Sequence, residues 1–163
     1  MIIENTKQDL SNILHVINDA AIKYKGVIPN DCWHEPYMLE EELVNEFDNG
    51  VRMFGYTKNN ILVGVMGIQE LQDTTLIRHA YTLSDYQGIG VGNSLLQYLF
   101  QINKSSSWYV GTWQDATWAI TFYEKAGFIL HRKKQTVELL KKYWSVPLKQ
   151  IENSVVLGKN TSD

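Results

Sequence analysis

The residues best suited to chemistry form a glycine-rich run, Gln87-Gly88-Ile89-Gly90-Val91-Gly92. It follows an apolar, strand-like segment (76–83) and leads into an amphipathic, helix-like segment (93–101). At such a turn, free main-chain N–H groups converge and the helix dipole adds partial positive charge. Because glycine also lets a ligand approach the main chain closely, the run predicts an anion site suited to phosphate.

The spacing of these glycines narrows the class of ligand. A dinucleotide fingerprint starting at Gly88 needs a third glycine where Asn93 stands, and the Gly-Lys-Ser/Thr end of a Walker A loop does not occur in the chain. The spacing that fits is Gln-x-x-Gly-x-Gly. Here the chain resembles the GNAT superfamily of acetyl-CoA-dependent N-acetyltransferases, in which this loop wraps the pyrophosphate of coenzyme A.

A second segment strengthens the resemblance. Residues 119–128 read Ala-Ile-Thr-Phe-Tyr-Glu-Lys-Ala-Gly-Phe, similar to the family's later motif A-x-x-F-Y-E-K-x-G-F, and they follow the first motif in the family's order. The resemblance covers roughly residues 5–157. One departure is visible: Ala116 stands where members often carry an asparagine that contacts the pantetheine arm, which leaves the strength of cofactor binding open.

The resemblance implies a role for each matched position. The cosubstrate would be acetyl-CoA, with its pantetheine arm bound by the main chain of Tyr81, Thr82 and Leu83. The pyrophosphate would be held by main-chain N–H groups of the loop, namely Gln87, Gly88, Ile89, Gly90, Val91, Gly92 and Asn93. Tyr123 would be the catalytic acid, because a phenol beside the thioester sulfur can protonate the leaving thiolate. A buried core tyrosine is the alternative interpretation, since Tyr123 also fits an apolar helical face.

The group that removes the proton from the amine is a separate question. A free alkylamine is protonated near neutral pH, because its ordinary pKa is about 10.4, so a carboxylate, a histidine or a water chain must take the proton. The candidate bases are His79, Glu70 and the adjacent pair His34 and Glu35, and for His79 a structural histidine is the alternative. Simple strand alternation puts His79 on the face opposite Arg78, and a bulge would reverse that.

The acceptor amine is expected in a pocket shaped by the loop of residues 25–36, which the family uses for this purpose. His34 and Glu35 in that loop are the candidate substrate-binding residues, although both could be ordinary loop residues. Aromatic residues near this side would suit an apolar or aromatic amine, or simply fill the core: Trp33, Tyr37, Trp113 and Trp118. We expect no metal, because His34 and Glu35 are adjacent and no histidine has ligand spacing.

The elements that position these residues follow from periodicity and turn residues. Helices are predicted at 6–24, 38–47, 93–101, 115–126 and 136–143, and strands at 51–56, 61–68, 74–83, 108–112, 128–132 and 151–157. Their order predicts an α/β (α+β) fold with a mixed, mostly antiparallel central sheet and flanking helices. By resemblance, the central parallel strands, 76–83 and 108–112, splay apart around the pantetheine.

Composition bounds the remaining possibilities. The chain has 163 residues, 44% hydrophobic and 20% charged, with a net charge of −3, which is typical of one globular domain. We therefore expect a single N-acetyltransferase domain over residues 1–163. The sequence has no concentrated basic stretch of the kind that predicts nucleic-acid binding. It also has no apolar run long enough to predict a membrane helix. Cys32 is the only cysteine, which excludes an internal disulfide.

These patterns together predict an N-acetyltransferase that moves the acetyl group of acetyl-CoA to a primary amine by direct attack in a ternary complex. The amine belongs to a small molecule or a peptide, and its identity stays open. A non-catalytic acyl-CoA-binding or sensor domain on the same fold is the alternative, and an unrelated nucleotide-binding protein is a second one. We expect a cytoplasmic protein, and a homodimer is possible through the aromatic C-terminal third.

Overall fold

A computed structural model describes residues 1–161 and contains one seven-stranded sheet in the order β1-β2-β3-β4-β5-β7-β6. Its strands are β1 (Ile2–Asn5), β2 (Val51–Lys58), β3 (Ile61–Glu70), β4 (Thr75–Thr82), β5 (Ser107–Trp113), β6 (Ile129–Leu130) and β7 (Ser154–Asn160). Every neighbouring pair is antiparallel except β4 and β5, which run parallel. The predicted fold class is confirmed: a mixed, mostly antiparallel sheet with one parallel pair.

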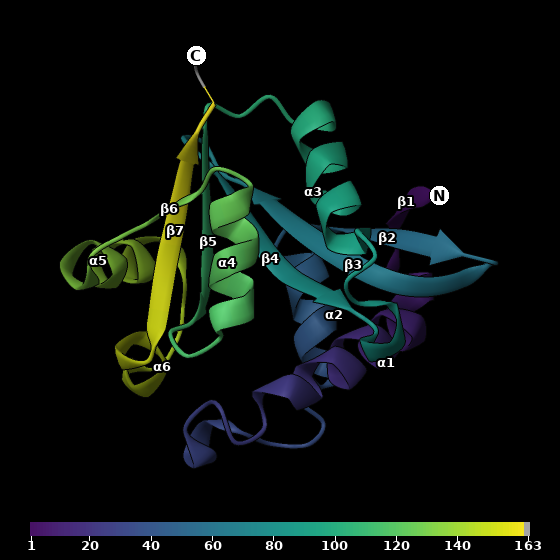
Figure 1. Ribbon diagram of the computed structural model, residues 1–163, viewed down its shortest axis with the longest axis horizontal. Coiled ribbons are helices and arrows are strands. Elements are labelled where there is room, and N and C mark those ends of the chain that lie inside the picture. Colours follow the sequence, from purple (N-terminus) through teal and green to yellow (C-terminus); the bar gives the residue numbers. More distant parts are fainter. Residues whose placement is uncertain (162–163) are drawn as a thin grey trace.

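Six helices flank this sheet in the described residues: α1 (Leu10–Ala21), α2 (Glu40–Asp48), α3 (Val91–Ile102), α4 (Thr117–Lys125), α5 (Lys133–Tyr143) and α6 (Leu148–Glu152). Figure 1 shows α3 and α4 in front of the sheet, with α2 behind it and α5 beside β7. The main core lies between these layers and contains fully buried side chains from α1, β3 and α3, such as Ile17, Val65 and Leu95. Burial of these faces is the main term that stabilises the arrangement.

Several elements differ from the sequence-based prediction, either because they were missed or because their boundaries lie elsewhere. The short edge strand β1 and the helix α6 were not predicted, because four or five residues carry too little periodicity to be recognised. The closing strand begins at Ser154, since Ile151 belongs to α6. The second helix begins at Glu40, since the main chain of Met38 is held by the Asn18 side chain through hydrogen bonds of 2.8 Å and 3.0 Å.

The parallel strands β4 and β5 separate partway along their length. They pair only from Thr75 with Trp108 to Ile77 with Val110, yet β4 continues to Thr82 and β5 to Trp113. Figure 1 shows the two strands diverging beyond this point, with α4 in front of the gap. The facing edges of the later residues are therefore without a strand partner, and these edges position both cavities described below.

A bulge in β4 sets the direction of the side chains on one edge of that gap. Val65 pairs with Tyr81 and Gly67 pairs with Arg78, so His79 and Ala80 together oppose a single residue of β3. His79 adopts a φ of 58°, which is unusual for a residue with a side chain. Gly67 permits this close approach, because a Cβ there would lie 2.8 Å from the Arg78 carbonyl oxygen. The bulge puts His79 and Arg78 on the same side, against simple alternation.

Candidate active site

The glycine-rich run folds as a loop that ends in the N-terminus of α3. Gly88 and Gly90 have φ values of 78° and 91°, and Gly90 is the N-cap residue immediately before the helix. The side chain of Gln87 donates a hydrogen bond to the Thr82 carbonyl (3.0 Å), which closes the loop against the end of β4. A side chain at Gly90 would be strained by its left-handed backbone, so glycine is needed there for its conformation.

The main-chain N–H groups of this loop are available to a ligand. Within residues 1–161, none of the N–H groups from residue 87 to residue 93 makes a hydrogen bond, and the first helical bond of α3 runs from Ser94 to Gly90 (2.9 Å). Free N–H groups at a helix N-terminus are the arrangement that binds phosphate. Gly92 faces the ring of Phe122 in α4, and a Cβ there would lie 3.4 Å from that ring, in close van der Waals contact.

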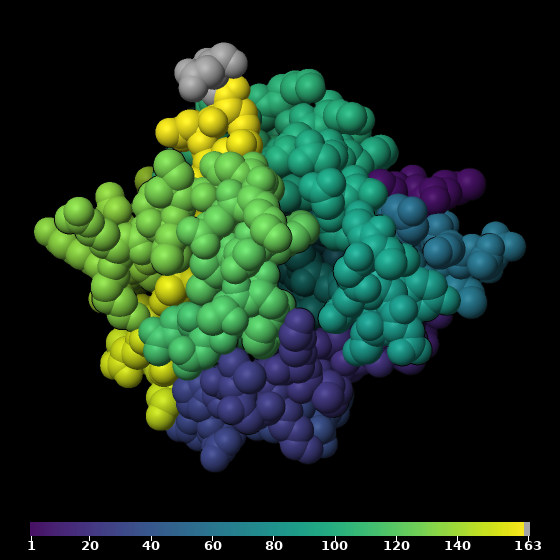
Figure 2. All heavy atoms as spheres, viewed as in Figure 1, coloured from purple at the N-terminus to yellow at the C-terminus, as the bar shows by residue number. Residues whose placement is uncertain are grey.

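A cavity of about 420 Å³, the loop cavity, lies beside these groups. Figure 2 shows it as a hollow between α4 in green and the teal segment that includes α3. Its walls come from the predicted loop and from residues that were not predicted to be near it: Lys23, Tyr24, Val65, Met66, Tyr86, Trp118, Phe122. Lys23 lies over Trp118, with its ammonium 4.5 Å from the ring centroid. A cation at the mouth of the cavity adds to its suitability for an anionic ligand.

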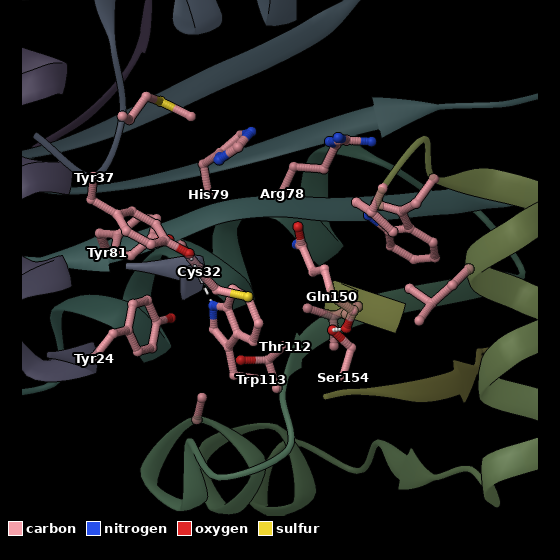
Figure 3. A pocket seen from close by; sticks show the side chains of 18 of the residues that line it. Tyr24, Cys32, Tyr37, Arg78, His79, Tyr81, Thr112, Trp113, Gln150 and Ser154 are labelled. Atoms are coloured by element: carbon pink, nitrogen blue, oxygen red, sulfur yellow. Dashed lines mark hydrogen bonds between the residues drawn. The ribbon is translucent and has the colours of Figure 1, made fainter. Parts of the chain in front are cut away.

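A second cavity of about 540 Å³, the split cavity, occupies the gap between β4 and β5 and extends beneath α5 and α6. Figure 3 shows Tyr24, Tyr37 and Tyr81 grouped at one end, with Gln150 and Ser154 toward the other. The Trp113 indole donates a hydrogen bond to the Tyr37 hydroxyl (2.9 Å) and fixes that ring. An ion pair between Asp31 and Lys149 (3.1 Å) joins the 25–39 loop to α6 at the rim.

Tyr123 lies in the wall that the two cavities share, together with Tyr24, Ala80, Tyr81 and Ala119. Tyr123 is 4% exposed, and its ring packs edge-on against Phe122 and Phe128 at centroid distances of 5.0 Å and 5.5 Å. The hydroxyl makes no hydrogen bond within residues 1–161. Burial raises the pKa of Tyr123, and the nearby Tyr24 adds to the effect, so the phenol keeps its proton at neutral pH.

Tyr24, Tyr37 and Tyr81 surround the same junction. Tyr24 lies 5.4 Å from Tyr37 and 6.3 Å from Tyr81, measured between ring centroids. Burial raises the pKa of Tyr37 to about 12, against hydrogen bonds from Trp113 and Tyr81 that lower it. Burial likewise raises the pKa of Tyr81 well above its usual range. All of these phenols are therefore neutral hydrogen-bonding groups at physiological pH.

His79 reaches the split cavity from the bulge in β4. Its Nε2 lies 2.7 Å from Oε2 of Glu46 in α2, and Nε of Arg78 lies 3.0 Å from the same oxygen. Burial alone would raise the pKa of Glu46, but the hydrogen bonds and charges of His79 and Arg78 outweigh burial and lower it. The ionised carboxylate can only accept, so a neutral His79 carries its proton on Nε2 and offers Nδ1 as a proton acceptor.

The remaining predicted residues divide between the site and the surface. His34 lines the split cavity, with Nδ1 2.8 Å from the Pro36 carbonyl oxygen and its ring stacked on Tyr37. Glu35 does not line it and faces Lys25 at 3.5 Å on the surface, so we remove it from the acceptor site. Glu70 is paired with Arg52 (2.6 Å), away from both cavities. The Ile89 side chain is largely exposed and does not line the loop cavity, so only the main chain of Ile89 can contact a ligand there.

The predicted aromatic group is also divided. Tyr37 and Trp113 line the split cavity, Trp118 lines the loop cavity, and Trp33 lines neither but stacks on Tyr37 at 5.8 Å. Trp118 and Phe122 are four residues apart, so they lie on the same face of α4. This spacing is the sequence feature from which their common position at the loop cavity could have been predicted. Ala116 is fully buried in a small cluster with Ile28 and Trp113, outside the loop cavity, so this position serves packing.

The described residues contain no group of three or more His, Cys, Asp or Glu side chains placed to hold a metal ion. None of the helices in residues 1–161 is long and apolar enough to cross a membrane.

Residues 132–134 read Arg-Lys-Lys, a short basic run. Within it, the Lys133 ammonium donates hydrogen bonds to the carbonyl oxygens of Ile151 and Glu152 and so helps to fix the end of α6.

Comparison with known proteins gives the family. A model of the acetyltransferase (GNAT) domain matches residues 16–141, more than half of the chain. The chain belongs to the GNAT acetyltransferase family. The matched range includes both sequence motifs and ends before α6 and β7. No match is found among curated proteins.

Solved structures show the same GNAT fold. The PaiA N-acetyltransferase of Thermoplasma acidophilum, in complex with coenzyme A, has a TM-score of 0.75 and 17% identity, over 98% of each chain. The ribosomal-protein-S18-alanine N-acetyltransferase of Escherichia coli has a TM-score of 0.71 and 17% identity, over 100% of this chain and 94% of that one. An acetyltransferase from Streptococcus agalactiae has a TM-score of 0.71 and 19% identity, over 98% and 97%. At this level of identity, the likeness establishes the fold.

Proposed function

We propose that the protein transfers the acetyl group of acetyl-CoA to a primary amine, by direct attack in a ternary complex. The observation that carries the proposal is the meeting of the loop cavity and the split cavity at Tyr123. A transferase that joins two substrates directly needs two sites with a shared wall, because holding both reactants in contact removes most of the entropic cost of the encounter. The PaiA structure in complex with coenzyme A supports the choice of donor.

The loop cavity fits the donor by the chemistry of its walls. The free N–H groups of residues 87–93 would hold the pyrophosphate, and Lys23 would add positive charge at the mouth. The edge of β4 at Tyr81 and Thr82 has no strand partner on the side of β5 and would bind the amides of the pantetheine arm. The N–H of Leu83 already donates to the Val63 carbonyl oxygen in β3 (2.8 Å), so Leu83 does not offer that group to the arm. Acetyl-CoA would supply an acetyl thioester, whose transfer forms a C–N bond, breaks the C–S bond and releases a thiolate.

Tyr123 would donate the proton that the leaving sulfur needs. Its raised pKa keeps the phenol protonated, which suits an acid and excludes a base at neutral pH. Its free hydroxyl borders both cavities, so it need not break an existing hydrogen bond before it acts. In this family, a tyrosine at the matching motif position often has this role.

His79 would take the proton from the attacking amine through Nδ1. Glu46 would hold the ring in one orientation through the 2.7 Å contact with Nε2 and stabilise the imidazolium that forms. The left-handed backbone of His79 supports this role, because strained conformations concentrate at functional sites. His34 lines the same cavity and would contribute to holding the acceptor.

The substitution Tyr123→Phe tests the proposal. Because the hydroxyl makes no hydrogen bond within residues 1–161, the change removes only the proton donor and leaves the packing of the ring intact. We expect kcat for amine acetylation to fall about 100-fold or more, with an unchanged Kd for coenzyme A by calorimetry. Tyr109→Phe is the matched control, since Tyr109 lies on β5 and lines neither cavity. Unchanged turnover in Tyr123→Phe would remove Tyr123 from the mechanism, and coenzyme A binding without any turnover would favour a sensor domain.

A further inference from the structure

The far end of the split cavity, away from Tyr123, has an apolar wall beside the polar residues Gln150 and Ser154. Leu140, Trp144, Val146 and Pro147 line it, and Leu140, Trp144 and Val146 pack in one hydrophobic cluster. On the opposite side Gly111 of β5 leaves room, since a Cβ there would lie 3.6 Å from both Leu140 and Trp144. Trp144, Val146 and Pro147 lie beyond the residues that match the family model, whereas Leu140 lies within them.

The charges that line the split cavity favour one sign of acceptor. Its two side-chain cations, Arg78 and Lys149, are both engaged, with Glu46 at 3.0 Å and Asp31 at 3.1 Å respectively. Arg78 also donates to the Gln69 side chain (3.2 Å). Glu42 lines the cavity and has no cationic partner within residues 1–161. The walls therefore favour an ammonium group, while a carboxylate or phosphate would find no lysine or arginine free to pair with it among the described lining residues.

We propose that the acceptor is a small primary amine whose body is an aromatic ring or an alkyl chain and which carries no carboxylate or phosphate. The amine end lies against Tyr81 and Tyr123, and the body lies against Trp144 and Leu140. The volume of about 540 Å³ suits a drug-sized molecule. A peptide fits less well, because main-chain amides placed against Leu140, Trp144 and Val146 find no hydrogen-bond partner on those side chains. Of the polar side chains near this end, Ser154 already donates its hydroxyl to the Gln150 carbonyl oxygen. The inference rests on the proposed function and adds the class of acceptor to it.

A panel of matched amines tests this class by measuring the thiol released from acetyl-CoA. The key pair is 2-phenylethylamine and phenylalanine, which share the ring and the amine and differ by one carboxylate. An alanine-initiated tripeptide and hexylamine complete the panel. We expect kcat/KM for 2-phenylethylamine and for hexylamine to exceed that for phenylalanine and for the tripeptide by at least about tenfold, because burying an unpaired carboxylate or peptide group is costly.

Two substitutions test the position of the acceptor body. Trp144→Ala should raise KM for 2-phenylethylamine about tenfold while changing kcat little, because it removes apolar contact remote from the reacting atoms. Leu139→Ala is the control, since Leu139 packs in the same cluster but does not line the cavity. Gly111→Ala adds a methyl group where the geometry permits one, and it should raise KM for 2-phenylethylamine more than KM for methylamine.

The outcomes separate this inference from the proposed function. Faster thiol release with phenylalanine or the tripeptide than with 2-phenylethylamine overturns the acceptor class and leaves acetyl transfer standing. The same holds if Trp144→Ala and Leu139→Ala raise KM equally. Absence of thiol release with every amine, while calorimetry detects bound coenzyme A, overturns both. Selective KM effects of Trp144→Ala and Gly111→Ala, with the expected order of amines, support the acceptor class.

Discussion

The loop cavity and the split cavity are built in different ways. The key groups of the loop cavity are consecutive main-chain N–H groups between residues 87 and 93. The split cavity is lined by side chains from the 24–42 segment, β4, β5, α4, α5, α6 and β7, which are far apart in the sequence. A main-chain site tolerates most changes of side chain and can be recognised from one short motif. A side-chain site determines specificity and can vary while the first site stays the same.

The substitution Gly90→Ala tests the main-chain site, and it is expected to have the largest effect in this comparison. It strains a residue with φ of 91°, at a cost of about 1–2 kcal/mol, and redirects the N–H groups that would hold the pyrophosphate. We expect the Kd for coenzyme A to rise about tenfold or more, since each hydrogen bond to a charged group contributes about 1.5–3 kcal/mol. Calorimetry with coenzyme A measures the change.

Gly50→Ala is the matched control for that measurement. Gly50 has φ of 88° and open space around it, like Gly90, but it lies in the turn between α2 and β2 and lines neither cavity. It should lower the free energy of unfolding by a similar amount and leave the Kd for coenzyme A unchanged. Equal affinity of the two variants would contradict the assignment of the loop as the pyrophosphate site.

A smaller effect is expected from Glu46→Gln, which addresses the split cavity. The amide keeps an acceptor for Nε2 of His79 but loses the negative charge that stabilises a protonated ring. We expect kcat to fall about tenfold, consistent with the loss of one charge-assisted hydrogen bond, and the Kd for coenzyme A to stay unchanged.

Glu41→Gln is the control, because Glu41 lies on the same helix, is exposed and lines neither cavity. It should leave kcat unchanged. If Glu46→Gln lowers thermal stability without lowering kcat, Glu46 has only a structural role.

The smallest expected effect concerns stability in acid. Because the pKa of Glu46 is lowered in the folded protein from its ordinary value of 4.5, its contribution to the free energy of unfolding is present above pH 4.5. That contribution is lost as the pH falls through the lowered folded-state value. Urea unfolding of the wild type and Glu46→Gln should therefore differ at pH 7 and converge in acid. A difference that does not change with pH would exclude the ion-paired carboxylate as its source.

Local patterns in the sequence were sufficient for most of the fold. The glycine turn, the amphipathic helix after it and the Tyr123 motif are each determined by neighbouring residues, and the family model and the fold confirm the resemblance they carried. Short elements were missed: β1 depends on pairing with β2, and α6 spans only five residues. Such elements are stabilised by contacts outside their own sequence, so their periodicity is too weak to predict them.

In the site too, some features depend on contacts between elements that are distant in the sequence. Glu46 belongs to an acidic helix whose sequence indicates an exposed face, yet packing against β4 half-buries it and pairs it with Arg78 and His79. The direction of His79 depended on a bulge, and the bulge depends on the absence of a Cβ at Gly67, which lies on a different strand. No pattern within β4 alone contains that information.

The sequence by itself determined a family, a fold class and a loop of main-chain donors, because those properties come from residues adjacent in the chain. Only the tertiary structure decided which side chains surround the acceptor, that His79 contacts Glu46, and that Tyr123 borders two cavities. The physical reason is that a cavity is the space left between elements after they pack, and its shape and charge depend on residues that meet only when the chain is folded.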